Sequence, residues 1–291
     1  MTQASAAPVM AAAAPARANP ARWRLLLRRP TFVVGAAILL FWIICAIFGG
    51  SIVPHNPLAQ QLLANNAPPS GAHWFGTDQL GRDVLSRVIV GSRSILEVTP
   101  LATLLGTVLG SVLGLVMGYF GGAFDLVVSR LVEAVLALPA VIIAFLFIVA
   151  LGPSALTLVI VIGLIFTPVI ARTVRAAVLA ERNLDYLPAA RLLGERPWWI
   201  MIREILPNVA PTVLVEFTVR LGYAIFTVAT LSFLGFGIQP PTPDWGADIF
   251  ANYGVLPAGY WWETLFPALA VASLITAINL VADSIEQVLN G

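Results

Sequence analysis

The stretch Leu96–Phe120 reads LEVTPLATLLGTVLGSVLGLVMGYF and contains a single charged side chain, that of Glu97. A helix needs about 20 predominantly apolar residues to cross the hydrocarbon core of a bilayer. This stretch therefore predicts a membrane-spanning helix. Five further runs predict spans in the same way: Phe32–Val53, Leu131–Leu151, Ala155–Ile170, Val209–Phe236 and Thr264–Leu289. The Ala155 run is short for a span unless it extends toward Arg172. We expect an all-α polytopic membrane protein with six transmembrane helices.

The composition of the chain supports this class. Of its 291 residues, 59% are hydrophobic and 11% are charged, whereas a soluble domain carries about 25% charged residues. The mean hydropathy is +0.89. The net charge of +1 provides no positive field for nucleic acid, so we expect no nucleic-acid partner. The lone cysteine, Cys45, excludes an intramolecular disulfide and a cysteine-ligated metal centre within this chain.

The residues before the first span are of two kinds. Residues 1–20 are rich in Ala and Pro and are predicted to be disordered, whereas residues 21–30 (ARWRLLLRRP) are expected to lie at an anionic membrane surface. We interpret residues 31–53 as an uncleaved span, because this run is too long for a signal peptide and no clean cleavage site follows it. A mitochondrial presequence is the weaker alternative, since the first acidic residue is Asp78.

The arginines predict the orientation, because all sixteen basic residues are arginine. Twelve arginines fall in the N-terminal segment, at Arg130 and between Arg172 and Arg203, all on one side of the predicted topology. The opposite side holds three, which are Arg82, Arg87 and Arg93. Positively charged loops stay in the cytoplasm. We therefore expect a multi-pass membrane protein with both termini cytoplasmic.

A polar loop, residues 180–207, interrupts the apolar pattern between spans four and five. Residues 181–208 read ERNLDYLPAARLLGERPWWIMIREILPN, which predicts two short helices joined at Gly194, with Pro197 in the first turn of the second. Such a pair, with Arg191, Glu195 and Arg196 exposed, would suit docking of a soluble partner. A solvated loop that only enforces the topology is the alternative from charge alone.

Two segments predicted to lie outside, 54–94 and 235–262, are also unusual. The first contains HWFGTDQLGRDVLSR (73–87), a turn followed by an amphipathic helix with Asp83 and Arg87 one turn apart. We expect His55 and His73, in the same loop, to be solvated loop residues rather than a metal site. The second begins within SFLGFGIQPPTPDWG (232–246), whose prolines and glycines exclude regular helix. Plain loops are the alternative for both segments.

These three segments resemble the permease subunits of bacterial ABC importers of the dipeptide/oligopeptide/nickel family, in particular the "C"-type subunit. Ala-Ala, three residues, Gly, ten residues and Ile-Leu-Pro resembles the "EAA" loop, although Pro188 stands where that family often has Glu, and Glu204 where an apolar residue is common. Gly-Thr-Asp-x-x-Gly-Arg-Asp-Val-Leu-Ser-Arg and Phe-Leu-Gly-x-Gly-x-Gln-Pro-Pro-x-Pro-x-Trp-Gly are similar to the segments after the first span and before the last. The resemblance covers about residues 22–291.

The resemblance implies a type I importer permease fold, with residues 95–291 as a five-helix core, and it implies roles for particular residues. In the coupling loop, the residues expected to dock on an ATPase subunit are Asp185, Tyr186, Ala189, Ala190, Gly194, Leu206 and Pro207. The residues expected to contact a binding protein or partner are Gly76, Thr77, Asp78, Gly81, Arg82, Asp83, Gln239, Pro240, Pro241 and Trp245. The implied partners are a homologous second permease subunit, two ATP-binding subunits and an extracytoplasmic substrate-binding protein.

The sequence also limits the chemistry of the chain. Lysine is absent, so a P-loop cannot be present, and we expect no enzyme activity and no cofactor or metal in this chain, with ATP and Mg bound by partner subunits. The expected function is to form half of a pathway for di- or oligopeptides, or alternatively for nickel chelates, glutathione or another small solute. An ion-driven secondary transporter is a distant alternative, because it would need buried relay charges. Glu216 and Arg220, one turn apart in the fifth span, are better explained as a neutralising ion pair, either within the membrane or facing the pathway. A structural or assembly factor is an equally remote alternative function.

Overall fold

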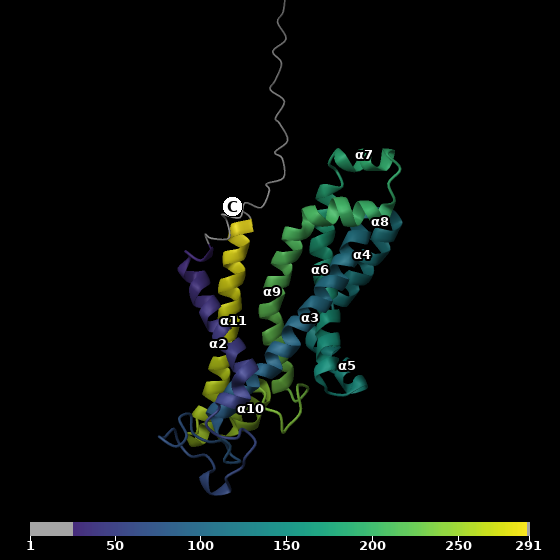
Figure 1. Cartoon of the computed structure of the whole chain (residues 1–291). Coiled ribbons are helices and arrows are strands. Elements are labelled where there is room, and N and C mark those ends of the chain that lie inside the picture. Colours follow the sequence, from purple (N-terminus) through teal and green to yellow (C-terminus); the bar gives the residue numbers. More distant parts are fainter. Residues whose placement is uncertain (1–25, 290–291) are drawn as a thin grey trace, which may run out of the picture.

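The computed structural model describes residues 26–289, which fold as a bundle of helices (Figure 1). Its long helices are α2 (Pro30–Ile52), α3 (Val84–Phe120), α6 (Ala155–Glu181), α9 (Leu206–Phe233) and α11 (Trp262–Leu289). Within these described residues the only β-type pairing is an isolated antiparallel bridge between Thr77 and Asp83. The predicted all-α class is therefore confirmed. The segment predicted to be disordered, residues 1–20, lies outside the described residues.

Shorter elements connect the long helices. They are η1 (Leu62–Ala64), α4 (Gly122–Leu136), α5 (Ala140–Leu151), α7 (Tyr186–Leu192), α8 (Pro197–Trp199), the π-helical η2 (Ile200–Ile205), α10 (Trp245–Asn252) and η3 (Tyr253–Ala258). Segment Pro197–Phe233, which joins α8, η2 and α9, runs as one helical span. The second predicted short helix of the loop is thus the beginning of a long one, because Pro197 starts it and no helix-breaking turn separates it from α9.

Among the described residues, five helices are long and apolar enough to cross a membrane, and the bent pair of α4 and α5 makes a sixth crossing if the pair is counted as one span. We predicted one span over Leu131–Leu151, and within it α4 and α5 meet at 86°. Pro139 lies at the bend and has no N–H to continue the α4 hydrogen-bond ladder, which explains the break. Together α4 and α5 connect the end of α3 to the start of α6, which lies at the other end of the bundle (Figure 1).

Two other predicted spans are too short. Helix α3 begins at Val84 rather than near Leu96, so the segment predicted as 54–94 ends inside a helix. Helix α6 continues beyond Ile170 to Glu181. The α3 extension is a polar stretch that the apolar count missed, because other parts of the chain bury its polar side chains, as shown by Ser86, Ser92 and Ser94 in its first turns.

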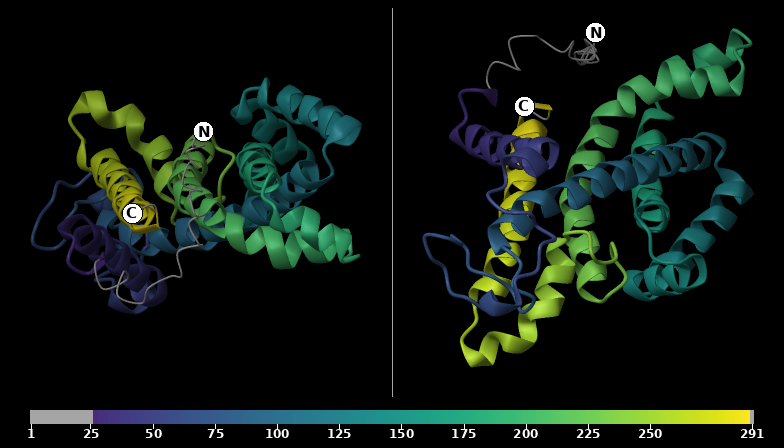
Figure 2. Two further views of the ribbon diagram at one scale, coloured as in Figure 1. Left: turned by 90° about the horizontal axis from the view of Figure 1, so that it is seen from above. Right: turned by 60° about the horizontal axis from the view of Figure 1, so that its bottom comes forward.

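The bundle has two distinct ends, which Figures 1 and 2 show. Helix α7 lies at one end, and the start of α2 and the last turns of α11 point to the same side. Helix α10 lies at the opposite end, together with the loop between α2 and α3. We call these the α7 end (residues 181–208) and the α10 end (residues 53–83 and 234–262).

Glycine packing joins α3 to α6 along most of their length. Gly106, Gly110, Gly114 and Gly118 recur at every fourth residue and therefore share one face of α3. A Cβ atom at Gly114 would lie 2.7 Å from the carbonyl oxygen of Ala171, and one at Gly110 would lie 2.7 Å from the Cβ of Ile170. The absence of these side chains lets the two backbones approach closely, as small residues do in membrane helix pairs.

We predict that Gly114→Ala destabilises the chain by about 1–3 kcal/mol, because the added methyl group overpacks the α3–α6 contact. The matched control is Gly50→Ala in α2, where a new Cβ would have no neighbour within 4 Å. Alanine favours helix over glycine by up to about 1 kcal/mol, so the control should be neutral or stabilising. Thermal unfolding of the two purified variants in detergent compares them, and equal midpoints would contradict the packing argument.

Candidate functional site

The α7 end carries the predicted pair of helices joined at a glycine. Gly194 has a φ of +79°, a left-handed conformation that favours glycine, and its N–H donates to the carbonyl of Arg191 at 3.0 Å. The next N–H, from Glu195, donates to Ala190 O at 3.3 Å and completes the end of α7. Pro197 then begins the following helix. The turn at Gly194 and the helix start at Pro197 are therefore confirmed.

The predicted docking residues divide into two groups. Asp185, Ala189, Gly194 and Pro207 are exposed. Ala190 is buried, together with Leu187, in the hydrophobic core, and Tyr186 and Leu206 are half-buried against it. The side chains of the second group anchor the loop, and only the first group lies on the surface that a partner could reach.

Tyr186 fastens α7 to the helices on both sides of it. Its hydroxyl donates to Glu181 Oε2 at 2.7 Å, at the end of α6, and accepts from Asn208 Nδ2 at 3.0 Å, at the start of α9. Burial, reinforced by the bond to the Glu181 carboxylate, raises the pKa of Tyr186 to about 12. The phenol therefore stays protonated and keeps its donor role at physiological pH.

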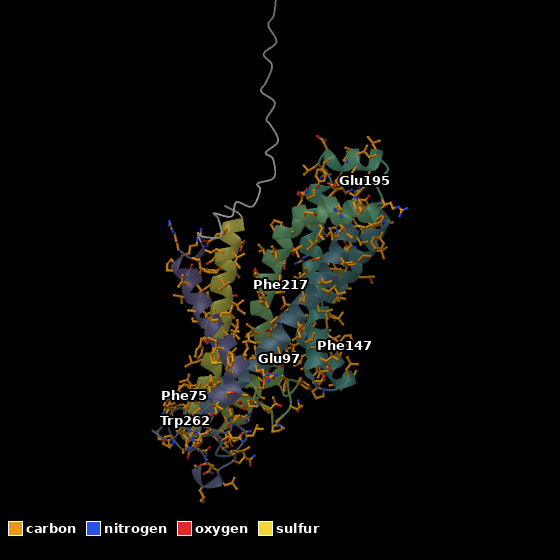
Figure 3. The ribbon with its side chains drawn as sticks, in the orientation of Figure 1. Phe75, Glu97, Phe147, Glu195, Phe217 and Trp262 are labelled. Atoms are coloured by element: carbon orange, nitrogen blue, oxygen red, sulfur yellow. The ribbon has the colours of Figure 1, made fainter. Side chains whose placement is uncertain are left out.

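Two leucines beside the turn were not singled out by the sequence. The side chains of Leu192 and Leu193 are 89% and 82% exposed, directly before Gly194. Trp198 and Ile202 are also exposed on the helix that follows. Figure 3 labels Glu195 in the same region. Adjacent exposed apolar side chains of this size mark an interaction surface, and we call these four residues the α7 apolar patch.

The α10 end is built around buried ion pairs. Asp78 accepts from the Arg82 Nε at 2.6 Å and from the Arg82 backbone N–H at 2.9 Å. Arg87, in the first turns of α3, donates from Nε to Asp248 Oδ1 at 3.0 Å, so it pairs with α10 rather than with Asp83. The one-turn spacing of Asp83 and Arg87 does not lead to an ion pair between them, because Asp83 caps α3 by accepting from the Ser86 N–H at 2.8 Å.

The glycines and tryptophans of this end fill tight positions. Gly81 has a φ of +69°, and a Cβ there would lie 2.0 Å from the Gln61 carbonyl oxygen. Trp245 is fully buried and donates to Val88 O at 2.8 Å, and Trp262 donates to Thr77 O at 3.1 Å. The ring of Phe75, labelled with Trp262 in Figure 3, stacks on Phe266. These contacts hold the loops rigidly against α3, α10 and α11.

This burial revises the contact surface expected from the sequence. Gly76, Thr77, Asp78, Gly81, Arg82, Asp83 and Trp245 are all buried within the chain, so their side chains support the loops instead of facing a partner. Gln239, Pro240 and Pro241 remain exposed. Sequence reasoning missed the apolar side chains that are exposed at this end, which include Leu62, Leu63 and Trp74.

At the same end, Asp244 caps α10 by accepting from the Ala247 N–H at 3.0 Å. Burial raises the pKa of this carboxyl to about 6.

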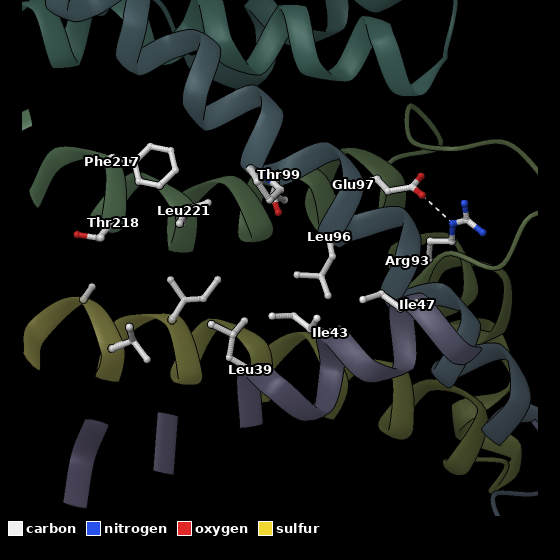
Figure 4. A pocket seen from close by; sticks show the side chains of 15 residues that line it. Leu39, Ile43, Ile47, Arg93, Leu96, Glu97, Thr99, Phe217, Thr218 and Leu221 are labelled. Atoms are coloured by element: carbon white, nitrogen blue, oxygen red, sulfur yellow. Dashed lines mark hydrogen bonds and ion pairs between the residues drawn. The ribbon is translucent and has the colours of Figure 1, made fainter. Parts of the chain in front are cut away.

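A pocket of about 700 Å³ opens between four long helices (Figure 4). Its walls come from α2 (Leu39, Ile43, Ala46, Ile47), α3 (Arg93, Leu96, Glu97, Thr99, Pro100), α9 (Phe217, Thr218, Leu221) and α11 (Ile278, Val281, Ala282). They are mostly apolar, and the charged lining residues Arg93 and Glu97 pair with each other at 2.6 Å. The pocket therefore suits an apolar occupant, or a polar one that needs no fixed charge.

The intramembrane charges predicted in α9 form the expected ion pair. Arg220 Nε donates to Glu216 Oε2 at 3.1 Å. The carbon of the guanidinium also lies 5.2 Å from the centroid of the Tyr223 ring. Glu216 and Arg220 flank the pocket-lining Phe217 and Thr218 in sequence without lining the pocket themselves.

A multi-pass helical bundle with a pocket between its helices and an apolar patch on a protruding loop has the features of a membrane transport component. Comparison with protein families identifies it. Residues 110–291 match the family of binding-protein-dependent transport system inner membrane components, and residues 21–69 match the N-terminal transmembrane domain of oligopeptide transport permease C. The chain belongs to this permease family.

Individual relatives cover almost the whole chain. The dipeptide transport system permease protein DppC of Bacillus subtilis is 36% identical over 92% of this chain and 84% of its own length. The probable D,D-dipeptide transport system permease protein DdpC of Escherichia coli is 34% identical over 90% and 87%. The glutathione transport system permease protein GsiD of Shigella flexneri is 36% identical over 92% and 88%.

We predict that Arg87→Ala destabilises the chain by about 3–5 kcal/mol, because it leaves the Asp248 carboxylate buried without its partner. Arg93→Ala, six residues further along the same helix, removes an exposed ion pair and should cost no more than about 1 kcal/mol. Thermal unfolding in detergent measures both variants. A similar loss for the two arginines would show that the Arg87–Asp248 contact does not hold the α10 end together.

Proposed function

We propose that the chain is one of two permease subunits of an ATP-driven importer and forms half of its pathway for di- or oligopeptides. The α7 apolar patch, on a glycine-linked loop of a chain in this family, carries the proposal, because Leu192 and Leu193 are exposed on a polar loop, where no lipid would cover them. Dipeptide permeases among the relatives support the substrate class. The relatives also include glutathione permeases, so the second candidate substrate is a peptide-like small solute.

In this proposal the α7 end faces the cytoplasm and docks on an ATP-binding subunit. The arginine distribution supports that orientation, because the arginine-rich loop before α9 lies at the same end as the start of α2 and the end of α11. The sequence has no lysine, so it contains no P-loop lysine, and ATP would be hydrolysed in the partner subunits. The chain itself would act by changing shape.

The helices offer a direct route for that change. Leu187 and Ala190 bury α7 in the core, and Tyr186 bonds to α6 and to α9. Segment Pro197–Phe233 then continues as one helical span from the loop to the other end of the bundle. A displacement of α7 by a closing ATPase pair would therefore move α9, which forms one wall of the pocket.

The α10 end would face outward and receive the substrate-binding protein. Its exposed residues are Gln239, Pro240 and Pro241 together with Leu62, Leu63 and Trp74, which stand on loops fixed by buried ion pairs. A rigid, partly apolar platform suits a partner that docks and leaves in each transport cycle. A second, homologous permease subunit would complete the pathway.

Ion-driven secondary transport fits the structure less well. It would use titratable relay groups deep in the spans, and the candidates in α9, Glu216 and Arg220, neutralise each other at 3.1 Å.

Reconstitution tests the proposal. The chain alone in liposomes should bind no ATP and transport no peptide, with or without an ion gradient. Uptake should appear only when the second permease, the ATPase subunits and the binding protein are present, and peptides should stimulate ATP hydrolysis only with the binding protein. Peptide uptake by the chain alone would overturn the proposal.

The docking surface has its own test. Leu192→Ser with Leu193→Ser should weaken copurification of the ATPase subunits about tenfold or more, since interface anchors contribute more than about 1 kcal/mol each. Both side chains are exposed, so the thermal stability of the isolated chain should change little. The matched control, Leu62→Ser with Leu63→Ser, alters exposed leucines at the α10 end and should leave ATPase assembly intact. Equal assembly of both variants would exclude the α7 apolar patch as the docking surface.

A further inference from the structure

Two histidines and one carboxylate meet in the loop that joins α2 to α3. His73 Nδ1 lies 2.8 Å from Asp83 Oδ1, and His55 Nδ1 lies 3.7 Å from the same oxygen. The two imidazole centroids are 4.6 Å apart. The expectation of two separate, solvated histidines is therefore wrong, because the loop folds back and brings both rings to the N-terminus of α3. We propose that His55, His73 and Asp83 bind a divalent transition-metal ion such as Zn²⁺.

The donor set has the chemistry that zinc requires. Zinc in proteins takes imidazole nitrogen at about 2.0–2.1 Å and carboxylate oxygen at about 2.0–2.2 Å in a tetrahedral arrangement. Ligand atoms in such a tetrahedron are separated by about 3.4 Å. The observed separations of 2.8 and 3.7 Å lie on either side of this value. Ligand atoms of all three residues lie within 4.8 Å of one another, so small side-chain rotations would form the site.

Asp83 is held in place for this role by its other oxygen. Its Oδ2 accepts from the Ser86 N–H at 2.8 Å and from the Ser86 hydroxyl at 2.6 Å, which fixes the carboxylate as the cap of α3. Its Oδ1 faces the two imidazoles. Such secondary bonds orient a metal ligand and are a regular part of metal sites.

His55 supplies a second, independent indication of a missing partner. Its Nδ1 is buried and makes no hydrogen bond, although buried polar atoms nearly always have a partner. The nearby arginines do not serve it, because Arg82 pairs with Asp78 and Arg87 with Asp248. A metal ion bound between the rings would satisfy His55 Nδ1 and the Asp83 carboxylate together.

The site is open on one side only. The side chain of His55 is 36% exposed, whereas those of His73 and Asp83 are 12% and 1% exposed. An ion can therefore enter past His55, and water can take the fourth position that three protein ligands leave free. The bound ion would tie the residues after α2, the middle of the loop and the first turn of α3 to one point, which should stabilise the α10 end.

The test is direct zinc binding by the full-length chain, purified through an affinity tag that contains no histidine and stripped with a chelator. Zinc alone is titrated against a competing chromophoric chelator. We expect about one ion per chain. His55→Ala and His73→Ala should each weaken binding by about a hundredfold or more, since loss of an outer-shell partner alone costs about 10–100-fold. These are the two histidines of the sequence, so no other imidazole competes.

Asp83→Asn separates the ligand role of Asp83 from its structural role. Asparagine caps helices about as well as aspartate, so α3 should keep its N-terminus while the anionic ligand is lost and binding weakens. The matched control is Glu97→Gln, which removes an exposed carboxylate from the same helix and should leave zinc affinity unchanged. If His73→Ala is not recovered folded, His55→Ala, at the more exposed ring, provides the same comparison.

Two further measurements decide the outcome. Co²⁺ should give ligand-field absorption bands with the wild-type chain that are lost in the histidine variants, and zinc should raise the midpoint of thermal unfolding of the wild type only. The proposal is overturned if the wild type binds no more zinc than the His55→Ala, His73→Ala double variant. It is equally overturned if zinc leaves the midpoint of thermal unfolding of the wild type unchanged, which would leave a simple histidine–aspartate contact.

Discussion

Close packing of α3 on α6 is the contact on which the rest of the bundle depends. Within a bilayer the lipid chains are as apolar as leucine, so helices associate through van der Waals contact and interhelical hydrogen bonds rather than through the hydrophobic effect. Four glycines at intervals of four residues let α3 make such contact along α6, from Gly106 to Gly118. Because α3 also packs against α2 and α9, this contact sets the position of the other spans.

The two ends of the bundle differ in which side chains they bury and which they expose. At the α10 end, charged groups such as Arg87 and Asp248 are buried and paired, and they lock the start of α3 to the loops and to α10. At the α7 end, apolar groups such as Leu192 and Leu193 are exposed without a partner in the chain. The first arrangement makes a rigid end whose charges are already satisfied. The α7 end leaves apolar surface exposed to water, and such a surface marks a site where a partner protein binds.

The sequence predicts the parts of this structure that local physics determines. Apolar length identified the spans, and the conformational freedom of Gly194 identified the turn of the loop. What it missed depends on contacts between distant segments. The polar first turns of α3 form a buried helix only because α10 and the loop cover them. Arg87 pairs with Asp248, which is 161 residues away in the sequence, and not with Asp83 one turn away. The meeting of His55 with His73 and the exposure of Leu192 likewise follow from the folded path of the chain, which no periodicity in the sequence records.

Helix α9 connects the two ends, and its charge pair explains how it can do so inside a membrane. An unpaired Glu216 or Arg220 inside the membrane would cost free energy. The helix would then favour positions in which the unpaired charge reaches water. Paired at 3.1 Å on one face of the same helix, the two charges would travel with α9 in the proposed movement and need no partner from another helix. A rigid span that keeps its charges satisfied can therefore shift against α2 and α11 across the mostly apolar pocket without breaking an ion pair, so the cost of movement falls on packing alone.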